Sequence, residues 1–333
     1  MKKKTNITID DIARDLGVSK TTVSRAISGK GRISSATRER IQEYIQRTNY
    51  RPSAAAKGLA ESRTYNVALV VPRSLFKMDM PFTRKSMTAI CEEAFLQDYN
   101  ILLCLSTDEN SASLLRTLDN RKVDGVILSR TVENDSLVDI LTEREIPFAT
   151  MGSLPAGVKG KATVEADHDQ VGGCCAFTIA FLRGGHGKVA ILGNDMNYIV
   201  NQSRWTGVCK GAAAVGLNEE DLVLRHGLRN RVQCCDAIDQ LLEQGICRFI
   251  TMDDEICLNV LLHLKERGLR IPEDVQIGSL YESTQITGWS PAIPMLQFDA
   301  SELGRVTCRE LIRYLRDEDY NALPTLGYRL IMH

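Results

Sequence analysis

The stretch Thr8-Ile9-Asp10-Asp11-Ile12-Ala13-Arg14-Asp15-Leu16-Gly17-Val18-Ser19-Lys20-Thr21-Thr22-Val23-Ser24-Arg25 decides the fold of the N-terminal part of the chain. Thr8 can cap a helix, an acid lies three residues on, and apolar residues recur at helical spacing until Gly17 ends the pattern. Ser19 can cap a second helix after a turn of only a few residues. The apolar residues of the two helices are Ile9, Ile12, Ala13, Leu16, Val23, Ala26 and Ile27. Two short helices joined in this way predict a helix-turn-helix.

A third helix with one apolar face is predicted from Ser35 to Thr48. Residues 8–48 therefore form a small all-α headpiece of three helices with its own core. The run Tyr50-Arg51-Pro52 ends the helical pattern, because the residue before a proline disfavours helical backbone. We place the helix-turn-helix domain at residues 1–51 and a hinge helix or linker at residues 52–62.

From residue 63 onward, apolar runs alternate with amphipathic helical stretches, the first of them from Met87 to Tyr99. Continuous apolar runs between helices are typical of parallel strands that are covered on both faces. The predicted strands are Asn66–Pro72, Ile101–Leu105, Gly125–Leu128, Phe148–Met151, Lys188–Leu192, Phe249–Met252 and Val275–Gly278. Residues 63–333 therefore predict an α/β core of two doubly wound parallel-sheet lobes.

The charge of the chain is divided unevenly. Residues 1–60 hold 13 Lys and Arg against 5 Asp and Glu, a net charge of +8, and the remaining residues hold 28 against 37, a net charge of −9. A basic first segment favours a polyanionic partner such as DNA. The sequence has no run of the roughly 20 apolar residues that a membrane helix needs, and no apolar signal segment follows its first residues. We therefore expect a cytoplasmic protein with no membrane partner.

The second helix of a helix-turn-helix enters the major groove of DNA and presents its first residues to base edges. Arginine and lysine can donate to guanine, and threonine offers both a hydroxyl and a methyl group. The candidates for this role are Lys20, Thr21, Thr22, Ser24 and Arg25. The alternative is a solvated basic helix on a small helical bundle.

The run from Thr8 to Arg25 closely resembles the N-terminal signature of the LacI/GalR (lactose-repressor) family, and Arg38-Glu39 and Asn49-Tyr50-Arg51-Pro52 follow at that family's spacing. The resemblance continues more loosely to the end of the chain and implies a core like that of periplasmic binding proteins. It implies a sequence-specific transcriptional regulator, a repressor, that binds operator DNA as a homodimer. A small-molecule effector, a sugar or another metabolite, would control it allosterically.

The same resemblance implies roles for residues of the headpiece. It assigns base contacts to Lys20, Thr21 and Arg25. It places five further residues near DNA phosphates, namely Thr8, Ser24, Ser34, Thr37 and Ser53, and it adds Arg32 and Asn49 as additional contacts. The segment Ser53–Ala60 resembles the family's hinge helix, which orders on operator DNA and inserts a leucine, here Leu59, into the minor groove. A flexible linker is the alternative for this segment.

In the core, the resemblance points to a cleft between the lobes, where doubly wound folds bind ligands at the carboxyl ends of their strands. Arg204 matches the family's ligand-binding arginine, with a surface ion pair as the alternative. Asp253 matches a position that accepts from ligand hydroxyls, with a helix cap as the alternative. Phe82 lies at a family-like position after the first strand. Arg73, with Lys77, indicates an anionic ligand, and solvated loop charges are the alternative.

One departure from the family concerns the far end of this cleft. Where the family usually has Gly-Phe-Asp-Asp, the chain has Gly278-Ser279-Leu280-Tyr281, so the acid that commonly holds sugar hydroxyls is missing and Tyr281 becomes the candidate contact. A regulator with a degenerate effector site therefore stays open as an alternative. So does a ligand-binding module without DNA function, although the basic headpiece speaks against it.

Metal sites and catalysis are not indicated. The ten cysteines include no C-x-x-C spacing, and the five histidines are not paired at metal-ligand spacing. The sequence also has no G-x-S-x-G elbow, no Walker lysine loop and no complete dinucleotide fingerprint. We therefore expect no enzyme, no cofactor and no metal.

Overall fold

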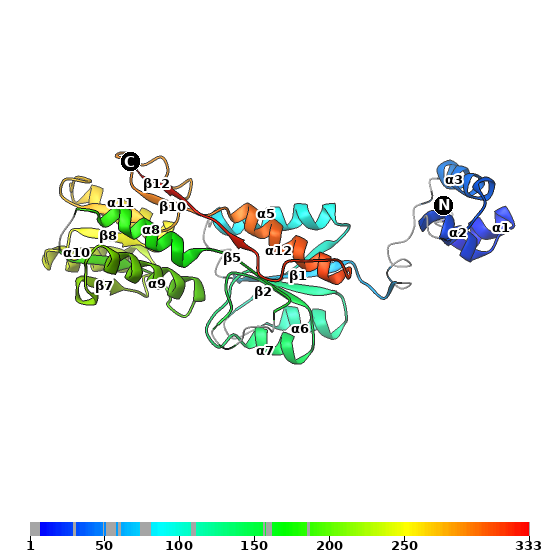
Figure 1. Cartoon of the computed structure of the whole chain (residues 1–333), viewed down its shortest axis with the longest axis horizontal. Coiled ribbons are helices and arrows are strands. Elements are labelled where there is room, and N and C mark those ends of the chain that lie inside the picture. The colour runs from blue at the N-terminus through cyan, green and yellow to red at the C-terminus, as the bar shows by residue number, and fades with distance from the viewer. Residues whose placement is uncertain are drawn as a thin grey trace, which may run out of the picture. The chain divides into compact units, whose positions relative to one another are not determined.

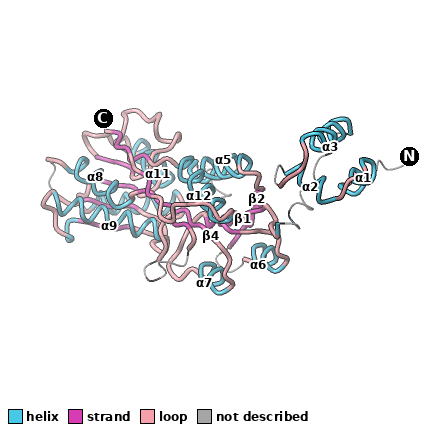
Figure 2. Tube along the Cα trace, turned by 45° about the vertical axis from the view of Figure 1, so that its right-hand side comes forward, coloured by secondary structure: helices cyan, strands magenta, loops and turns pink. Residues whose placement is uncertain are grey.

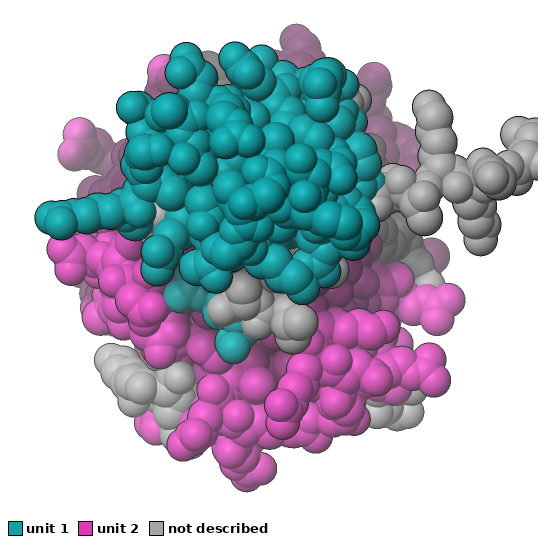
Figure 3. Space-filling model, turned by 90° about the vertical axis from the view of Figure 1, so that its right-hand side faces the viewer, with its two compact units in different colours: residues 1–64 teal, residues 65–333 magenta. Residues whose placement is uncertain are grey.

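The computed structural model forms two compact units, Met1–Thr64 and Tyr65–His333, which Figure 3 distinguishes by colour. The residues that the structure describes are 7–28, 31–48, 50, 58, 61–73, 81–107, 111–155, 157, 162–184 and 187–332.

The first unit contains the three predicted helices, α1 (Ile9–Leu16), α2 (Lys20–Ser28) and α3 (Ser35–Thr48). At the start of α1, the Thr8 hydroxyl accepts from the Asp11 backbone N–H at 3.3 Å, and the Thr8 N–H donates to the Asp11 carboxylate at 3.0 Å. Gly17 ends the helix at φ 62°, a left-handed conformation that favours glycine. The core of the unit consists of Ile12, Ala13, Val23, Ala26, Ile41 and Tyr50. The predicted helix-turn-helix is thus confirmed.

The second unit begins with a lobe built on a parallel sheet, whose strand order within the described residues is β11-β5-β4-β3-β1-β2. The strands are β1 (Asn66–Pro72), β2 (Asn100–Ser106), β3 (Gly125–Leu128), β4 (Phe148–Met151), β5 (Val164–His168) and β11 (Thr325–Leu326). The helices are α5 (Pro81–Leu96), α6 (Ala112–Asp119), α7 (Ser136–Glu143) and α12 (Ala300–Leu315).

Alternate residues of β1 belong to different cores of this first lobe. Val67, Leu69 and Val71 pack under α5 and α12, whereas Ala68 and Val70 pack under α6 and α7. Figure 1 shows these helix pairs on opposite faces of the sheet. The uninterrupted apolar run of β1 is therefore explained by burial on both faces.

The second lobe repeats this arrangement, with the described strand order β12-β10-β9-β8-β6-β7. Its strands are β6 (Val189–Leu192), β7 (Leu222–Arg225), β8 (Arg248–Thr251), β9 (Gln276–Ser279), β10 (Met295–Gln297) and the antiparallel β12 (Arg329–Ile331). Helices α8 (Gln170–Leu182) and α9 (Ile199–Ala214) cover one face, and α10 (Arg231–Glu243) and α11 (Asp254–Glu266) cover the other. Figure 2 shows the helices lying over the strands of both lobes.

The chain crosses between the lobes at three places, after β5, after β10 and after β11. Hydrogen bonds and a ring contact connect the crossovers to one another. The Asp169 N–H donates to the Leu326 carbonyl at 2.8 Å, the His168 Nε2 lies 3.2 Å from the Asp299 carbonyl oxygen, and the His168 ring packs on Phe298. Burial lowers the pKa of His168 to about 4, so this connection holds a neutral imidazole.

The predicted fold class of a helix-turn-helix headpiece and two doubly wound lobes is confirmed. All seven predicted strands are present, with ends that agree to within one residue. The predicted helix Met87–Tyr99 was wrong at both ends. Helix α5 runs from Pro81 to Leu96, and its first turns were missed because they carry the polar residues Thr83 and Ser86, which line the space between the lobes.

Candidate functional site

The exposed face of α2 carries the candidate base-reading residues. Lys20, Thr21, Ser24 and Arg25 are exposed, while the apolar residues between them point into the headpiece core. Thr22 is half-buried, and its hydroxyl lies 2.8 Å from that of Ser19, which caps the helix. Four of the five candidates therefore share one solvent-facing surface.

The other headpiece candidates lie mainly at the starts of helices. Thr8 caps α1, and Ser34 caps α3 by accepting from the Thr37 N–H at 3.1 Å. Arg32 is exposed just before α3. Backbone N–H groups at a helix start attract anions, so these positions suit phosphate contacts. The candidates Asn49, Ser53 and Leu59 lie outside the described residues.

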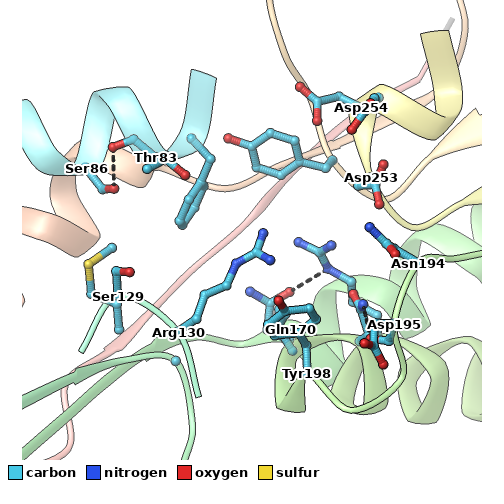
Figure 4. Close-up of a pocket in the computed structure, with 18 of the residues that line it drawn as sticks. Thr83, Ser86, Ser129, Arg130, Gln170, Asn194, Asp195, Tyr198, Asp253 and Asp254 are labelled. Carbon is cyan, nitrogen blue, oxygen red and sulfur yellow. Dashed lines mark hydrogen bonds between the residues drawn. The ribbon is translucent and has the colours of Figure 1, made fainter. Parts of the chain in front are cut away.

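A cavity of about 330 Å³ lies between the two lobes, at the carboxyl ends of their strands. Figure 4 shows polar side chains entering it from both sides. The first lobe contributes Phe82, Thr83, Ser86, Ser129, Arg130, Met151, Gly152, Asp167 and Leu303. The second lobe contributes Gln170, Asn194, Asp195, Tyr198, Val200, Asn201, Arg204, Arg229, Asp253, Asp254, Glu255 and Tyr281.

Arg204 extends from α9 into this cavity and is only 9% exposed. Its Nη1 donates to the Met252 carbonyl at 2.6 Å, and its Nε donates to the Gln170 side chain at 3.4 Å. Close packing of α8 on α9 holds this geometry, because a Cβ at Gly207 would lie 2.6 Å from the Val171 carbonyl oxygen. The alternative of a surface ion pair for Arg204 was therefore wrong.

Asp253 has the helix-capping role that was its alternative, and its position at the cavity leaves the proposed ligand contact open to it. It caps α11 by accepting from the Ile256 N–H at 2.9 Å, and it also lines the cavity. The next residue, Asp254, is 4% exposed, and its Oδ2 has no hydrogen-bond partner within the described residues. Burial raises the pKa of both carboxyls. Both side chains therefore lie where a ligand could reach them.

Phe82 and Tyr281 approach each other across the lobes, edge to face, with ring centroids 5.6 Å apart. Tyr281 is 5% exposed, and burial raises its pKa, so its phenol stays a neutral donor. Leu280 is fully buried in the second-lobe core. The sequence departure thus places an aromatic ring at the cavity and a core side chain behind it, instead of two carboxylates.

The remaining effector candidate, Arg73, is exposed at the end of β1 and is not among the described residues that line the cavity. Lys77 lies outside the described residues. The residues that sequence reasoning missed include Arg130, Gln170 and Tyr198. Arg130 follows the predicted strand Gly125–Leu128 by two positions, and polar residues just after a strand were the available signal.

The described part of the chain contains neither a metal-ligand cluster nor a membrane-spanning helix. No group of three or more His, Cys, Asp or Glu residues there could hold a metal ion. No described helix is long and apolar enough to cross a membrane.

A helix-turn-helix unit followed by a two-lobed core with an interlobe cavity defines the class of ligand-responsive DNA-binding regulators. The chain belongs to the LacI family, since residues 8–53 match the model for bacterial regulatory proteins of the lacI family. Residues 64–321 match the model for periplasmic binding proteins and the sugar-binding domain of the LacI family. The chain is thus a DNA-binding transcriptional regulator with an effector-binding domain.

Similar proteins cover nearly the whole chain. Catabolite control protein A of Priestia megaterium is 26% identical over 325 residues, 95% of this chain and 95% of that protein. The structure of the CelR–cellobiose complex is similar with a TM-score of 0.71 and 24% identity, covering 98% of each chain. The Lac repressor dimer bound to operator and an anti-inducer has a TM-score of 0.78 at 17% identity, again over 98% of each chain. The two structures support the fold alone.

Proposed function

We propose that the chain is a repressor that acts in the cytoplasm, binds a pseudo-palindromic operator as a homodimer, and changes its affinity for DNA when an effector occupies the interlobe cavity. The observation that carries the proposal is the presence, in one chain, of an exposed polar face on α2 and a polar cavity between two lobes. Effector and operator are then reciprocally coupled, because each favours one arrangement of the lobes.

For DNA, we assign base contacts to the exposed residues Lys20, Thr21, Ser24 and Arg25. Thr22 is assigned a smaller contribution to base contacts, because its hydroxyl already contacts that of Ser19. Phosphate contacts are assigned to Thr8, Ser34 and Thr37 at the helix starts, together with Arg32, Asn49 and Ser53. Leu59 is assigned to the minor groove. The basic charge of residues 1–60 supports this set.

For the homodimer, the supporting observation is apolar surface on the first lobe. Phe95 and Leu96 at the end of α5 are 79% and 74% exposed, and Leu103 and Leu105 on β2 are 47% and 40% exposed. Strand β2 lies at one edge of its sheet. Exposed apolar residues beside an open strand edge are features of an interaction surface. A second copy of the chain would cover them through the same patch.

For the effector, we assign contacts to Phe82, Arg204, Asp253 and Tyr281, which line one cavity. Residues 64–321 match the model that includes the sugar-binding domain of the LacI family, which supports a polyhydroxylated effector for this chain. Carboxylates accept from hydroxyls, a guanidinium donates to ring and hydroxyl oxygens, and aromatic edges contact apolar sugar faces.

The proposal is tested by selecting duplexes from a random pool with the full chain and measuring affinity for the selected sequence. Arg25→Ala should weaken binding by about 1–3 kcal/mol and relax preference at one base pair, and affinity should fall steeply with salt. Arg47→Ala, an exposed arginine on α3, is the matched control. Failure to select any sequence would refute the proposal.

A further inference from the structure

The interlobe cavity contains two guanidinium groups from opposite lobes, Arg130 and Arg204. Neither forms an ion pair with any carboxylate of the described residues. An arginine side chain has five N–H donors, and the Arg204 hydrogen bonds to Met252 and Gln170 use two of them. Cationic donors without a carboxylate partner thus face the same space from both sides.

Arg130 is half-buried and extends into the cavity in Figure 4 from the residues that follow β3. Its guanidinium carbon lies 4.6 Å from the centroid of the Tyr198 ring, on the second lobe. Burial is the main cause that lowers the pKa of Arg130, and nearby Arg204 lowers it further, while Tyr198 and the Asp253 carboxylate oppose this shift. The Arg130 guanidinium remains charged at neutral pH, so an anion would relieve both effects.

Three of the five acids among the described residues that line the cavity are engaged within the protein. Asp167 accepts from the Ser153 N–H at 2.9 Å and its hydroxyl at 2.6 Å, and Asp195 lies 3.7 Å from the exposed Arg229. Asp253 caps α11. The cavity also has polar atoms with no partner in the described structure, namely Asp254 Oδ2 on the second lobe and Ser129 Oγ on the first. Hydroxyl groups of a ligand could form hydrogen bonds with both of these atoms.

We infer that the effector is an anionic polyol, a sugar acid or a sugar phosphate, whose charged group binds between Arg130 and Arg204 while a hydroxyl donates to Asp254. This rests on the proposed effector function of the cavity and adds the chemical class of the ligand. Arg130 is then a residue that determines specificity. Because the two arginines belong to different lobes, the anionic group would also hold the lobes together.

Backbone contacts beside Arg130 support this link between ligand and lobe closure. The Glu133 N–H donates to the Asn197 carbonyl at 2.9 Å, and Val132 and Tyr198 form an isolated bridge between the lobes. A ligand held by Arg130 therefore acts on the segment that already joins the two lobes.

The first experiment uses inorganic phosphate as the probe, with the full-length chain and calorimetric titration at constant ionic strength. The wild-type protein should bind phosphate, and Arg130→Gln should weaken that binding by about tenfold or more, as expected for a charge-assisted contact. Lys122→Gln removes an exposed positive charge of the first lobe outside the cavity and should bind as the wild type does. Arg130→Lys keeps the positive charge but lacks the planar guanidinium, so its affinity for phosphate should lie between those of the wild type and Arg130→Gln.

The second experiment compares glucose, gluconate and glucose 6-phosphate by the same titration. Either anionic compound should bind at least about tenfold more tightly than glucose, and which of them does so separates a carboxylate from a phosphate. Asp254→Asn should weaken binding of the preferred sugar derivative without weakening that of inorganic phosphate, because it removes a hydrogen-bond acceptor for the hydroxyl and no positive charge. This variant keeps the side-chain shape and removes the negative charge.

Three results would overturn the inference: no phosphate binding by the wild type, equal phosphate binding by Arg130→Gln, or glucose binding at least as tight as that of both anions. None of them affects operator selection, so a failed anion site and a failed regulator are distinguishable. Circular dichroism tests whether Arg130→Gln is folded. If Arg130→Gln is unfolded, the phosphate affinity of Arg130→Lys is compared with that of the wild type instead.

Discussion

The headpiece and the cavity bring their functional residues together in opposite ways. In the headpiece, Lys20 to Arg25 occupy one helix, and the helix itself aligns them on one face. In the cavity, the first and last described lining residues along the chain, Phe82 and Leu303, are 221 positions apart, the difference between their residue numbers, and three chain crossovers bring the lobes together. A local surface depends on a small core and a cap, whereas a cavity depends on how two large lobes pack.

The first prediction separates the two regions by unfolding only one. Ile41→Ala should destabilise the headpiece by about 2–5 kcal/mol, because Ile41 is fully buried in a small core that has six buried members among the described residues. A unit that small has little stability to lose. Operator binding should disappear, while the second unit keeps its melting temperature. Circular dichroism and calorimetry measure both effects.

The control for this prediction is Gln42→Ala, an exposed position on the same helix, which should leave operator binding intact. If Ile41→Ala also lowered the melting temperature of the second unit, the two units would not be independent and the comparison would fail.

The second prediction concerns pH and the crossovers of the core. His168 has its pKa lowered by burial from 6.5 to about 4, so above pH 6.5 it is neutral in the folded and unfolded states alike. As pH falls from 6.5 to about 4, only the unfolded chain gains the proton. His168 should therefore contribute a loss of at most about 1.4 kcal/mol of stability in the second unit for each pH unit in that window.

His168→Phe keeps a ring against Phe298 and removes the titrating group, so its stability should depend less on pH over the same window. His226→Gln removes an exposed histidine of the second lobe and should follow the wild type. Thermal unfolding across a pH series measures the difference. Parallel curves for wild type and His168→Phe would contradict the assignment.

The same contrast explains how far sequence reasoning reaches. The headpiece contains a cap, a glycine stop and helical spacing within 18 consecutive residues, so α1 and the start of α2 were predicted almost residue by residue, while α3 was predicted from its own apolar face. In the core, β1, β3 and β4 were predicted because they are continuous apolar runs buried on both faces. Strand β5 was missed because buried and half-buried residues alternate along Val164–His168.

The cavity was predicted as a location but not as a set of residues. Arg204 and Asp253 were identified through the family resemblance. Phe82 was identified from its family-like position after the first strand, and Tyr281 because it stands where the family usually has an acid. Arg130 was missed because its role depends on facing Arg204 across the lobes, a proximity that no spacing in the sequence encodes. Conversely, Arg73 was chosen for its charge, and the fold leaves it exposed outside the cavity.

The third prediction perturbs the cavity through packing. Gly207→Ala places a methyl group 2.6 Å from the Cys174 Cβ and the Val171 carbonyl oxygen, so α9 must move away from α8. The cost should be about 1–3 kcal/mol of stability in the second unit. Because Arg204 lies one turn earlier on α9 and bonds to Gln170 on α8, ligand binding should weaken while isolated headpiece stability does not change.

Gly288→Ala is the matched glycine control, since a Cβ there meets nothing within 4 Å and φ is not positive. It should leave both thermal stability and ligand binding as in the wild type. Unchanged ligand binding in Gly207→Ala would mean that the α8–α9 contact does not position Arg204.

The smallest effect is expected at Thr8, where a structural and a functional role overlap. Thr8→Ala removes the cap of α1 and should lower headpiece stability by about 1 kcal/mol, whereas Thr8→Ser keeps the hydroxyl and should be close to the wild type. If the start of α1 also contacts a phosphate, Thr8→Ala should reduce operator affinity even at a temperature where the headpiece stays folded, and the slope of affinity against salt should change little, because no charge is lost. Operator titrations with all three proteins at low temperature test this. An affinity loss that vanishes on cooling would assign Thr8 to the cap alone.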